Sequence, residues 1–196
     1  MRIINWFGLA GGVLALVLVF VSVFYPWWHL SAGENLVVAD MSPFIMRFVL
    51  FGTVLDFPVV GLMNFIAALS FGLAGAVLLI YSFLPTKSYS MDLLGFAYRK
   101  PFYSLLFFTA VLFGLALVLG SLVGLEIPVA GSVNTLLPDS MSSGLVIRVL
   151  VSAGFQWPFW LAVATVILCF GARIYHWRIV KRTKDLGPNE NDSYSI

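Results

Sequence analysis

The stretch FYSLLFFTAVLFGLALVLGSLVG, residues 102–124, decides the fold class, because it runs for 23 residues without a charged side chain. A helix rises ~1.5 Å per residue, so about 20 apolar residues cross the ~30 Å hydrocarbon core of a bilayer. Residues 3–25, 59–84 and 157–179 are similarly long and apolar. At 61% hydrophobic and 10% charged residues, the 196-residue chain is too apolar for a water-soluble domain. The sequence therefore predicts an all-α integral membrane protein, a bundle of four transmembrane helices.

The first apolar stretch follows Arg2 and could instead be a secretory signal peptide. Its apolar run is longer than the ~7–15 residues of such a peptide, and bulky Phe24, Tyr25 and Trp27 stand where small residues would mark a cleavage site. We therefore expect the first helix to be retained.

Lysine and arginine predict the orientation of the bundle. Nine of the 11 basic residues fall on one side, whereas Arg47 and Arg148 fall on the other. Cytoplasmic segments of membrane proteins carry the excess of these residues. We therefore expect both termini in the cytoplasm, a multi-pass protein in the plasma membrane, and segments 27–57 and 125–156 on the outer side.

The two outer segments resemble each other. Each contains Met-Ser, then Arg, then an aromatic residue before Pro: Met41-Ser42, Arg47 and Phe57-Pro58 in the first, Met141-Ser142, Arg148 and Trp157-Pro158 in the second. A parallel repeat of residues 1–84 and 101–184 would produce this pattern, and so would chance similarity between apolar segments. We predict a single four-span domain over 1–184, followed by a polar, disordered cytoplasmic tail at 185–196.

Both outer segments contain runs typical of strands. Residues 36–38, 45–54, 129–137 and 145–152 are rich in β-branched and aromatic residues and are bounded by Gly, Pro, Asp or Ser. We expect two β-hairpins that join in one small extracytoplasmic sheet, because an isolated hairpin is marginally stable. The alternative is that parts of these runs, 45–55 and 145–153, form short helices at the membrane interface.

Alternation in the first outer segment leaves apolar residues on both faces of the predicted strand. Arg47 and Phe51 point to one side, and Met46 and Phe48 point to the other. A second apolar face needs a cover, so we expect contact with another copy, another membrane subunit or lipid headgroups, unless the hairpins cover each other. The candidate interaction residues are Trp27, Trp28, Arg47, Phe48, Phe51, Arg148, Val149 and Trp157.

Residues that carry chemistry are scarce. The interiors of the predicted spans contain no Asp, Glu, Lys, Arg or His, although catalysis or ion transport at depth usually needs them. His29 and His176 lie a bilayer apart in the predicted topology and cannot share a haem iron. No phosphate-binding loop, nucleophile elbow or metal-ligand spacing is present, and a net charge of +2 gives no reason for a nucleic-acid partner. We expect no enzymatic activity, cofactor or metal.

Small residues recur at helix-packing spacing inside the predicted spans. We expect the glycines among them to let neighbouring helices approach closely, and Asn64 to form an interhelical hydrogen bond contributing on the order of 1 kcal/mol. The helix-packing candidates are Gly8, Gly12, Asn64, Gly72, Gly114 and Gly120.

Four spans, a cytoplasmic N-terminus and a first outer segment that opens with Pro26-Trp-Trp-His-Leu-Ser31 resemble the claudin/PMP22-like tetraspan membrane proteins. The resemblance implies a left-handed four-helix bundle with an extracellular sheet that works through contacts between proteins. The chain carries neither the Gly-Leu-Trp segment nor the cysteine pair of that family, so no family site residue is transferred to it.

These observations together predict a non-enzymatic membrane scaffold or assembly protein. It would act through its outer hairpins, either as a homo-oligomer or as a structural subunit of a larger membrane complex. The alternative function is the binding of a lipid or quinone in the apolar space between the helices.

Overall fold

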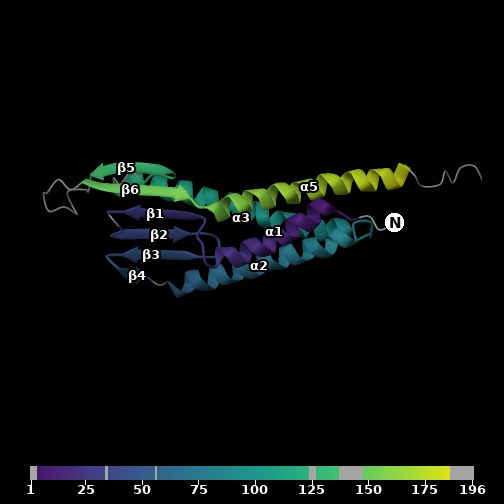
Figure 1. Ribbon diagram of the computed structural model, residues 1–196, viewed down its shortest axis with the longest axis horizontal. Coiled ribbons are helices and arrows are strands. Elements are labelled where there is room, and N and C mark those ends of the chain that lie inside the picture. The colour runs from purple at the N-terminus through teal and green to yellow at the C-terminus, as the bar shows by residue number, and fades with distance from the viewer. Residues whose placement is uncertain (1–3, 34, 56, 124–126, 137–147, 186–196) are drawn as a thin grey trace, which may run out of the picture.

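The computed structural model describes residues 4–33, 35–55, 57–123, 127–136 and 148–185, and this part of the chain contains four helices and six strands (Figure 1). The helices are α1 (Trp6–Ser22), α2 (Pro58–Phe83), α3 (Ser90–Val123) and α5 (Trp157–Asp185). The strands are β1 (Trp28–Ala32), β2 (Val37–Met41), β3 (Met46–Leu50), β4 (Thr53–Leu55), β5 (Gly131–Leu136) and β6 (Arg148–Phe155). The molecule is elongated, with the sheet at one end and the basic ends of the helices at the other.

Three of the helices are long and apolar enough to cross a membrane: Pro58–Phe83, Ser90–Val118 and Trp157–Ile179. Helix α1 is also apolar, but its 17 residues are fewer than the predicted 3–25; at ~1.5 Å per residue it is about 25 Å long. The helices are thus consistent with a membrane protein. Four crossings and the side on which each terminus lies remain predictions.

Two helices extend beyond the predicted spans. Helix α3 begins at Ser90 instead of residue 102 and passes through Pro101, and α5 continues to Asp185 instead of ending at residue 179. Pro101 removes one backbone hydrogen bond, yet the helix continues on both sides of it. Hydropathy marks only the apolar part of a helix, and α3 and α5 each include further helical turns that carry charged residues. Of the predicted tail, residues 186–196 lie outside the described residues.

The four helices pack in a closed ring in which each helix contacts two neighbours. Helix α1 packs between α2 and α5, and α3 contacts the same two helices. Asn5 caps the start of α1, because its side-chain oxygen accepts a hydrogen bond from the Gly8 N–H at 3.1 Å. Helix α2 starts at Pro58, where the missing N–H has no helical partner to lose.

All six strands belong to one antiparallel sheet with the order β4-β3-β2-β1-β6-β5. The predicted joining of the two outer segments in one sheet is confirmed, because β1 pairs with β2 on one side and with β6 on the other. The segments contribute four strands and two strands rather than one hairpin each, and β1 was not predicted. The alternative of short helices over 45–55 and 145–153 is wrong for the described residues, which form β3, β4 and β6.

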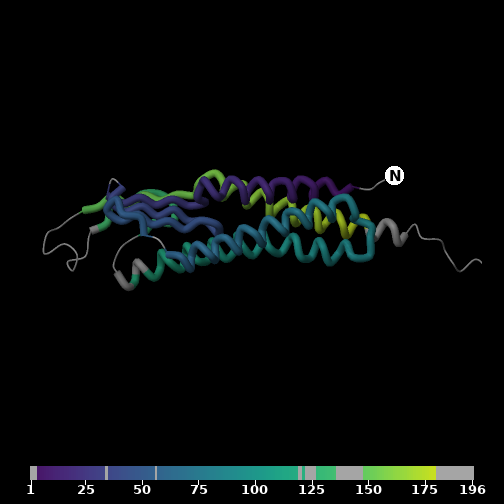
Figure 2. The backbone as a smooth tube through the Cα atoms, turned by 90° about the horizontal axis from the view of Figure 1, so that it is seen from below, coloured from purple at the N-terminus to yellow at the C-terminus, as the bar shows by residue number. Residues whose placement is uncertain are grey.

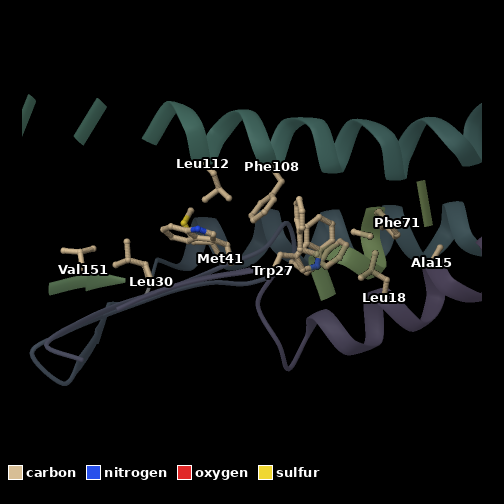
Figure 3. Packing of buried hydrophobic residues seen from close by; sticks show 14 residues of the cluster. Ala15, Leu18, Trp27, Leu30, Met41, Phe71, Phe108, Leu112 and Val151 are labelled. Carbon is tan, nitrogen blue, oxygen red and sulfur yellow. The ribbon is translucent and has the colours of Figure 1, made fainter. Parts of the chain in front are cut away.

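One face of the sheet packs against α2 and α3. In Figure 2 the sheet continues the line of α1, while α2 and α3 run below both. Figure 3 shows Phe108 and Leu112 of α3 facing Leu30, Met41 and Val151 of the sheet. Each of these five side chains is at most 6% exposed. The sheet is therefore not a separate domain, because it shares its core with the helices.

Candidate functional site

Trp27 fastens the sheet to the helix bundle. Its side chain is fully buried, and its indole N–H donates to the Ser22 hydroxyl at 2.8 Å. The ring makes edge-to-face contacts with Phe44, Phe108 and Phe159, whose centroids lie 5.8, 5.2 and 6.4 Å away. These three rings come from the β2–β3 link, α3 and α5, and Ser22 belongs to α1, so the Trp27 side chain joins four parts of the fold. Figure 3 shows Trp27 and Phe108 of this cluster.

Trp28 is also part of the protein's own core. It is 2% exposed, and its indole N–H donates to the Val129 carbonyl at 2.7 Å, which links the first outer segment to the second. Trp27 and Trp28 are therefore unavailable to a partner, and we leave them out of the proposed interaction surface. Sequence alone does not separate an aromatic residue in an interfacial belt from one that turns inward.

The face of the sheet turned away from the helices carries a row of charges. His29 and Asp40 lie opposite each other on β1 and β2, with Nδ1 of His29 2.7 Å from a carboxylate oxygen of Asp40. Arg47 lies opposite Asp40 on β3 and is exposed. In the neighbouring row, the Ser31 and Ser152 hydroxyls are hydrogen-bonded at 2.9 Å. This face is thus more polar than the alternation within β3 suggested.

The turn between β3 and β4 holds an exposed aromatic residue in an unfavourable backbone conformation. Phe51 and Gly52 have φ angles of 49° and 78°, and they connect the paired residues Leu50 and Thr53. This two-residue type I′ turn favours Asn-Gly, because both central residues need positive φ. A bulky residue at positive φ is a conformational outlier. Phe51 is nevertheless 72% exposed, so no packing among the described residues explains it.

Other exposed apolar side chains surround this turn. The Phe51 N–H donates to the Leu36 carbonyl at 2.7 Å, and the Gly33 N–H donates to the Leu150 carbonyl at 3.1 Å. Leu36, Leu50 and Leu150 are 53%, 40% and 54% exposed. We call Leu36, Leu50, Phe51 and Leu150 the apolar tip. The turn between β3 and β4 lies at the end of the sheet opposite α1 (Figure 1).

The remaining interaction candidates divide by burial. Arg148 is exposed at the start of β6, and Trp157 is 52% exposed and packs against Tyr25 at a ring-centroid distance of 5.7 Å. Phe48 and Val149 are half-buried and pack against the shared core. Phe51, Arg47, Arg148 and Trp157 are therefore the candidates that a partner can reach.

The helix-packing candidates fall into two groups, those at a close contact between helices and those that face open space. A Cβ on Gly8 would lie 2.6 Å from the Ser82 hydroxyl, and one on Gly12 would lie 3.0 Å from the Gly75 carbonyl, so α1 and α2 approach closely there. Gly72 and Gly114 face open space. Gly120 lies in α3, and its surroundings are outside the described part.

The buried amide that connects helices is Asn5 rather than the predicted Asn64. Its Nδ2 group donates to the Tyr81 hydroxyl at 2.8 Å and to the Ala172 carbonyl at 2.9 Å. Asn64 is half-buried and has no hydrogen-bond partner among the described residues. A capping residue directly before an apolar run is a sequence signal that could have identified Asn5.

A concave region lies between α2, α3 and the β2–β3 link. It has a volume of about 330 Å³, and its wall includes Met41, Met46 and Met63 together with the polar side chains of Ser42, Asn64 and Ser104. The wall is mainly apolar, with three polar groups that could orient a ligand.

The described residues contain no group of three or more His, Cys, Asp or Glu side chains that could hold a metal ion. Cys169 is buried in α5 as a free thiol. The chain matches no protein-family model and no curated protein.

Proposed function

We propose that this protein is a non-enzymatic membrane scaffold that assembles with copies of itself or with other membrane subunits through the apolar tip of its sheet. Four membrane crossings, cytoplasmic termini and an extracytoplasmic sheet belong to the same proposal, which the nine-to-two division of basic residues supports. Kinship with the claudin/PMP22-like tetraspan proteins is a further part of it, and its basis is the layout of the sequence.

The conformation of Phe51 carries the proposal. Holding a bulky residue at positive φ costs of order 1–3 kcal/mol, and such outliers cluster at functional sites. Asn at this position would relieve the strain and reduce the exposed apolar area. An exposed Phe therefore opposes both the turn preference and solubility, and contact with a partner supplies a reason for it.

The composition of the tip indicates the kind of partner. The tip combines one aromatic side chain, Phe51, with three exposed leucines. The cores of protein–protein interfaces are enriched in aromatic residues and depleted of charged ones. A protein surface is therefore the cover that we propose for the tip.

The direct test is Phe51→Asn, compared with Phe57→Asn. Asn suits both backbones, because Phe51 precedes Gly52 in a type I′ turn and Phe57 is the N-cap of α2, without a side-chain cap hydrogen bond. We expect Phe51→Asn to lower the oligomeric mass in mild detergent, or to release a stoichiometric subunit, while Phe57→Asn behaves as wild type. Light scattering after size exclusion and quantitative mass spectrometry measure both outcomes.

A cross-link provides a second readout in the native membrane. Val54 is 49% exposed on β4 beside the tip, and the native Cys169 is buried, so Val54→Cys supplies one reactive thiol. We expect a cross-linked species that disappears when Phe51→Asn is added. Assembly and cross-linking that persist unchanged in Phe51→Asn would refute the proposal.

The pocket beside Asn64 favours a second candidate function, the binding of a lipid or quinone. Asn64 and Ser104 line a mainly apolar wall, and their amide and hydroxyl groups could hydrogen-bond a carbonyl oxygen. A monomer that retains an extractable quinone or lipid, and loses it in Asn64→Leu, would favour this function over assembly.

A further inference from the structure

A basic pocket lies between α3 and α5, at the end of the bundle opposite the sheet. It has a volume of about 660 Å³, and three cationic side chains from two helices line it: Arg99, Lys100 and Arg173. Asp92 is the single carboxylate in the wall, so the ionisable groups of the pocket sum to +2. This concave site differs from the general excess of basic residues, because the charges converge on one cavity.

Tyr98 contacts one of these cations. An Arg173 guanidinium N–H donates to the Tyr98 hydroxyl, and the guanidinium carbon lies 4.5 Å from the centroid of the same ring. The hydroxyl accepts from a guanidinium and keeps its own proton to donate. Arg99 is the next residue on α3 and lines the same pocket. Two guanidinium groups and one O–H donor therefore line one cavity.

The cations of the pocket lack carboxylate partners. Within the described part of the chain, the single ion pair joins His29 and Asp40 at the far end of the molecule. Guanidinium groups bind carboxylate and phosphate in a bidentate geometry, and such charge-assisted hydrogen bonds are about twice as strong as neutral ones. An anion with several acceptor oxygens would satisfy the donors that Arg99 and Arg173 leave free.

The surroundings of the pocket point to a lipid as the source of that anion. Exposed apolar and aromatic side chains flank the basic groups: Phe96 at 46%, Tyr103 at 58%, Leu106 at 55% and Ile174 at 56%. Arg99, Lys100 and Arg173 lie within helices that are apolar enough to span a membrane, where long basic side chains reach toward headgroups. The site thus places charge at the edge of a hydrocarbon-facing surface.

We propose that this pocket binds the phosphate of an anionic glycerophospholipid, with Arg99, Lys100 and Arg173 on the phosphate, the Tyr98 hydroxyl donating to it, and the acyl chains along the outer faces of α3 and α5. This site is independent of the apolar tip, and the lipid is a structural ligand rather than a substrate.

The test uses native mass spectrometry of the full chain released from a neutral detergent. Phosphatidylglycerol and phosphatidylcholine are added separately at equal concentration, and inorganic phosphate is then added in millimolar excess to the phosphatidylglycerol sample. We expect phosphatidylglycerol adducts to be at least tenfold more abundant than phosphatidylcholine adducts, and we expect the excess of inorganic phosphate to leave them in place. Displacement by inorganic phosphate would assign the site to a soluble anion and overturn the lipid assignment.

Two double variants of equal charge identify the site. Arg99→Gln with Lys100→Gln alters the pocket, whereas Lys87→Gln with Arg178→Gln removes two exposed basic residues outside it. We expect a tenfold or greater loss of phosphatidylglycerol adducts in the first variant and no loss in the second. Equal losses in both variants, or none in the first, would overturn the proposal. All four residues are exposed, and matched thermal midpoints confirm folding.

Discussion

At the scale of single residues, Asn5 makes the connections that hold three helices together at the basic end of the bundle. It is fully buried, it caps α1 through Gly8, and its amide group bonds Tyr81 of α2 and Ala172 of α5. The Asn5 N–H also donates to the Ser82 carbonyl at 3.0 Å. One side chain therefore fixes where α1 starts relative to its two neighbours.

We expect Asn5→Ala to lower the free energy of unfolding by about 1–3 kcal/mol, because it leaves buried polar groups without partners. Asn134→Ala is the matched control, since Asn134 is exposed on β5 and is expected to change stability by less than about 0.5 kcal/mol. Denaturant titration in detergent micelles measures both values. Equal stability of the two variants would show that the Asn5 hydrogen bonds do not stabilise the bundle.

Trp27 gives a second prediction at this scale. Trp27→Ala removes a fully buried ring at the junction of the sheet and helices and is expected to cost about 3–5 kcal/mol of stability. Trp157→Ala, at a position that is 52% exposed, should cost much less. Thermal unfolding followed by tryptophan fluorescence distinguishes the two, and a small effect of Trp27→Ala would contradict the described packing.

The roles of individual residues were harder to predict from the sequence than the helices and strands. The pattern around Trp27 and Trp28 is typical of an interfacial aromatic belt, and only the pairing of β1 turns these rings inward. Asn64 lies inside an apolar run and was predicted to form an interhelical hydrogen bond. Asn5 lies just before an apolar run, and no such bond was predicted for it. Phe51 is exposed, as a candidate interaction residue has to be. Its positive φ angle comes from the tight turn between β3 and β4, and strand propensity does not predict that turn.

At the scale of elements, the contact between α1 and α2 depends on glycine at two positions one helical turn apart. Gly12 leaves no room for a methyl group against the Gly75 carbonyl, which is backbone and cannot rotate away. Gly72, by contrast, faces open space on the same helix as Gly75. The two glycines thus have opposite structural consequences although the sequence spacing suggested the same role.

We expect Gly12→Ala to destabilise the bundle by about 1–3 kcal/mol through overpacking. Gly72→Ala should be neutral or stabilise by up to about 1 kcal/mol, because alanine is the better helix former. Melting temperatures of the two variants in the same detergent give the comparison. A Gly12→Ala protein as stable as Gly72→Ala would contradict the close approach of α1 and α2.

Element type was predictable where one physical signal dominates. Long apolar runs predicted all four helices, and β-branched runs predicted parts of β2 to β6. Boundaries were less accurate, because α3 and α5 continue as helix past the point where their residues become charged. Strand β1 was missed because two tryptophans and a histidine read more readily as an interfacial segment than as a strand.

At the scale of the whole molecule, the sheet and the bundle share one hydrophobic core. Strands β1, β2 and β6 bury residues against α2 and α3, and Trp27 contacts rings on α3 and α5. Hydropathy predicted the membrane class, but no local signal predicts that β1 pairs with β6, which lies more than 100 residues later in the chain. Such long-range pairing depends on how the helices bring the two segments together.

The pairing of β1 with β6 also sets an order for biogenesis. While the ribosome is still making residues 148–155, β1 can bind β2 but exposes a row of unpaired N–H and C=O groups along its other side. The four-stranded ribbon of β1 to β4 therefore keeps an open edge until β6 pairs with it, and a chain truncated before β6 would retain that edge.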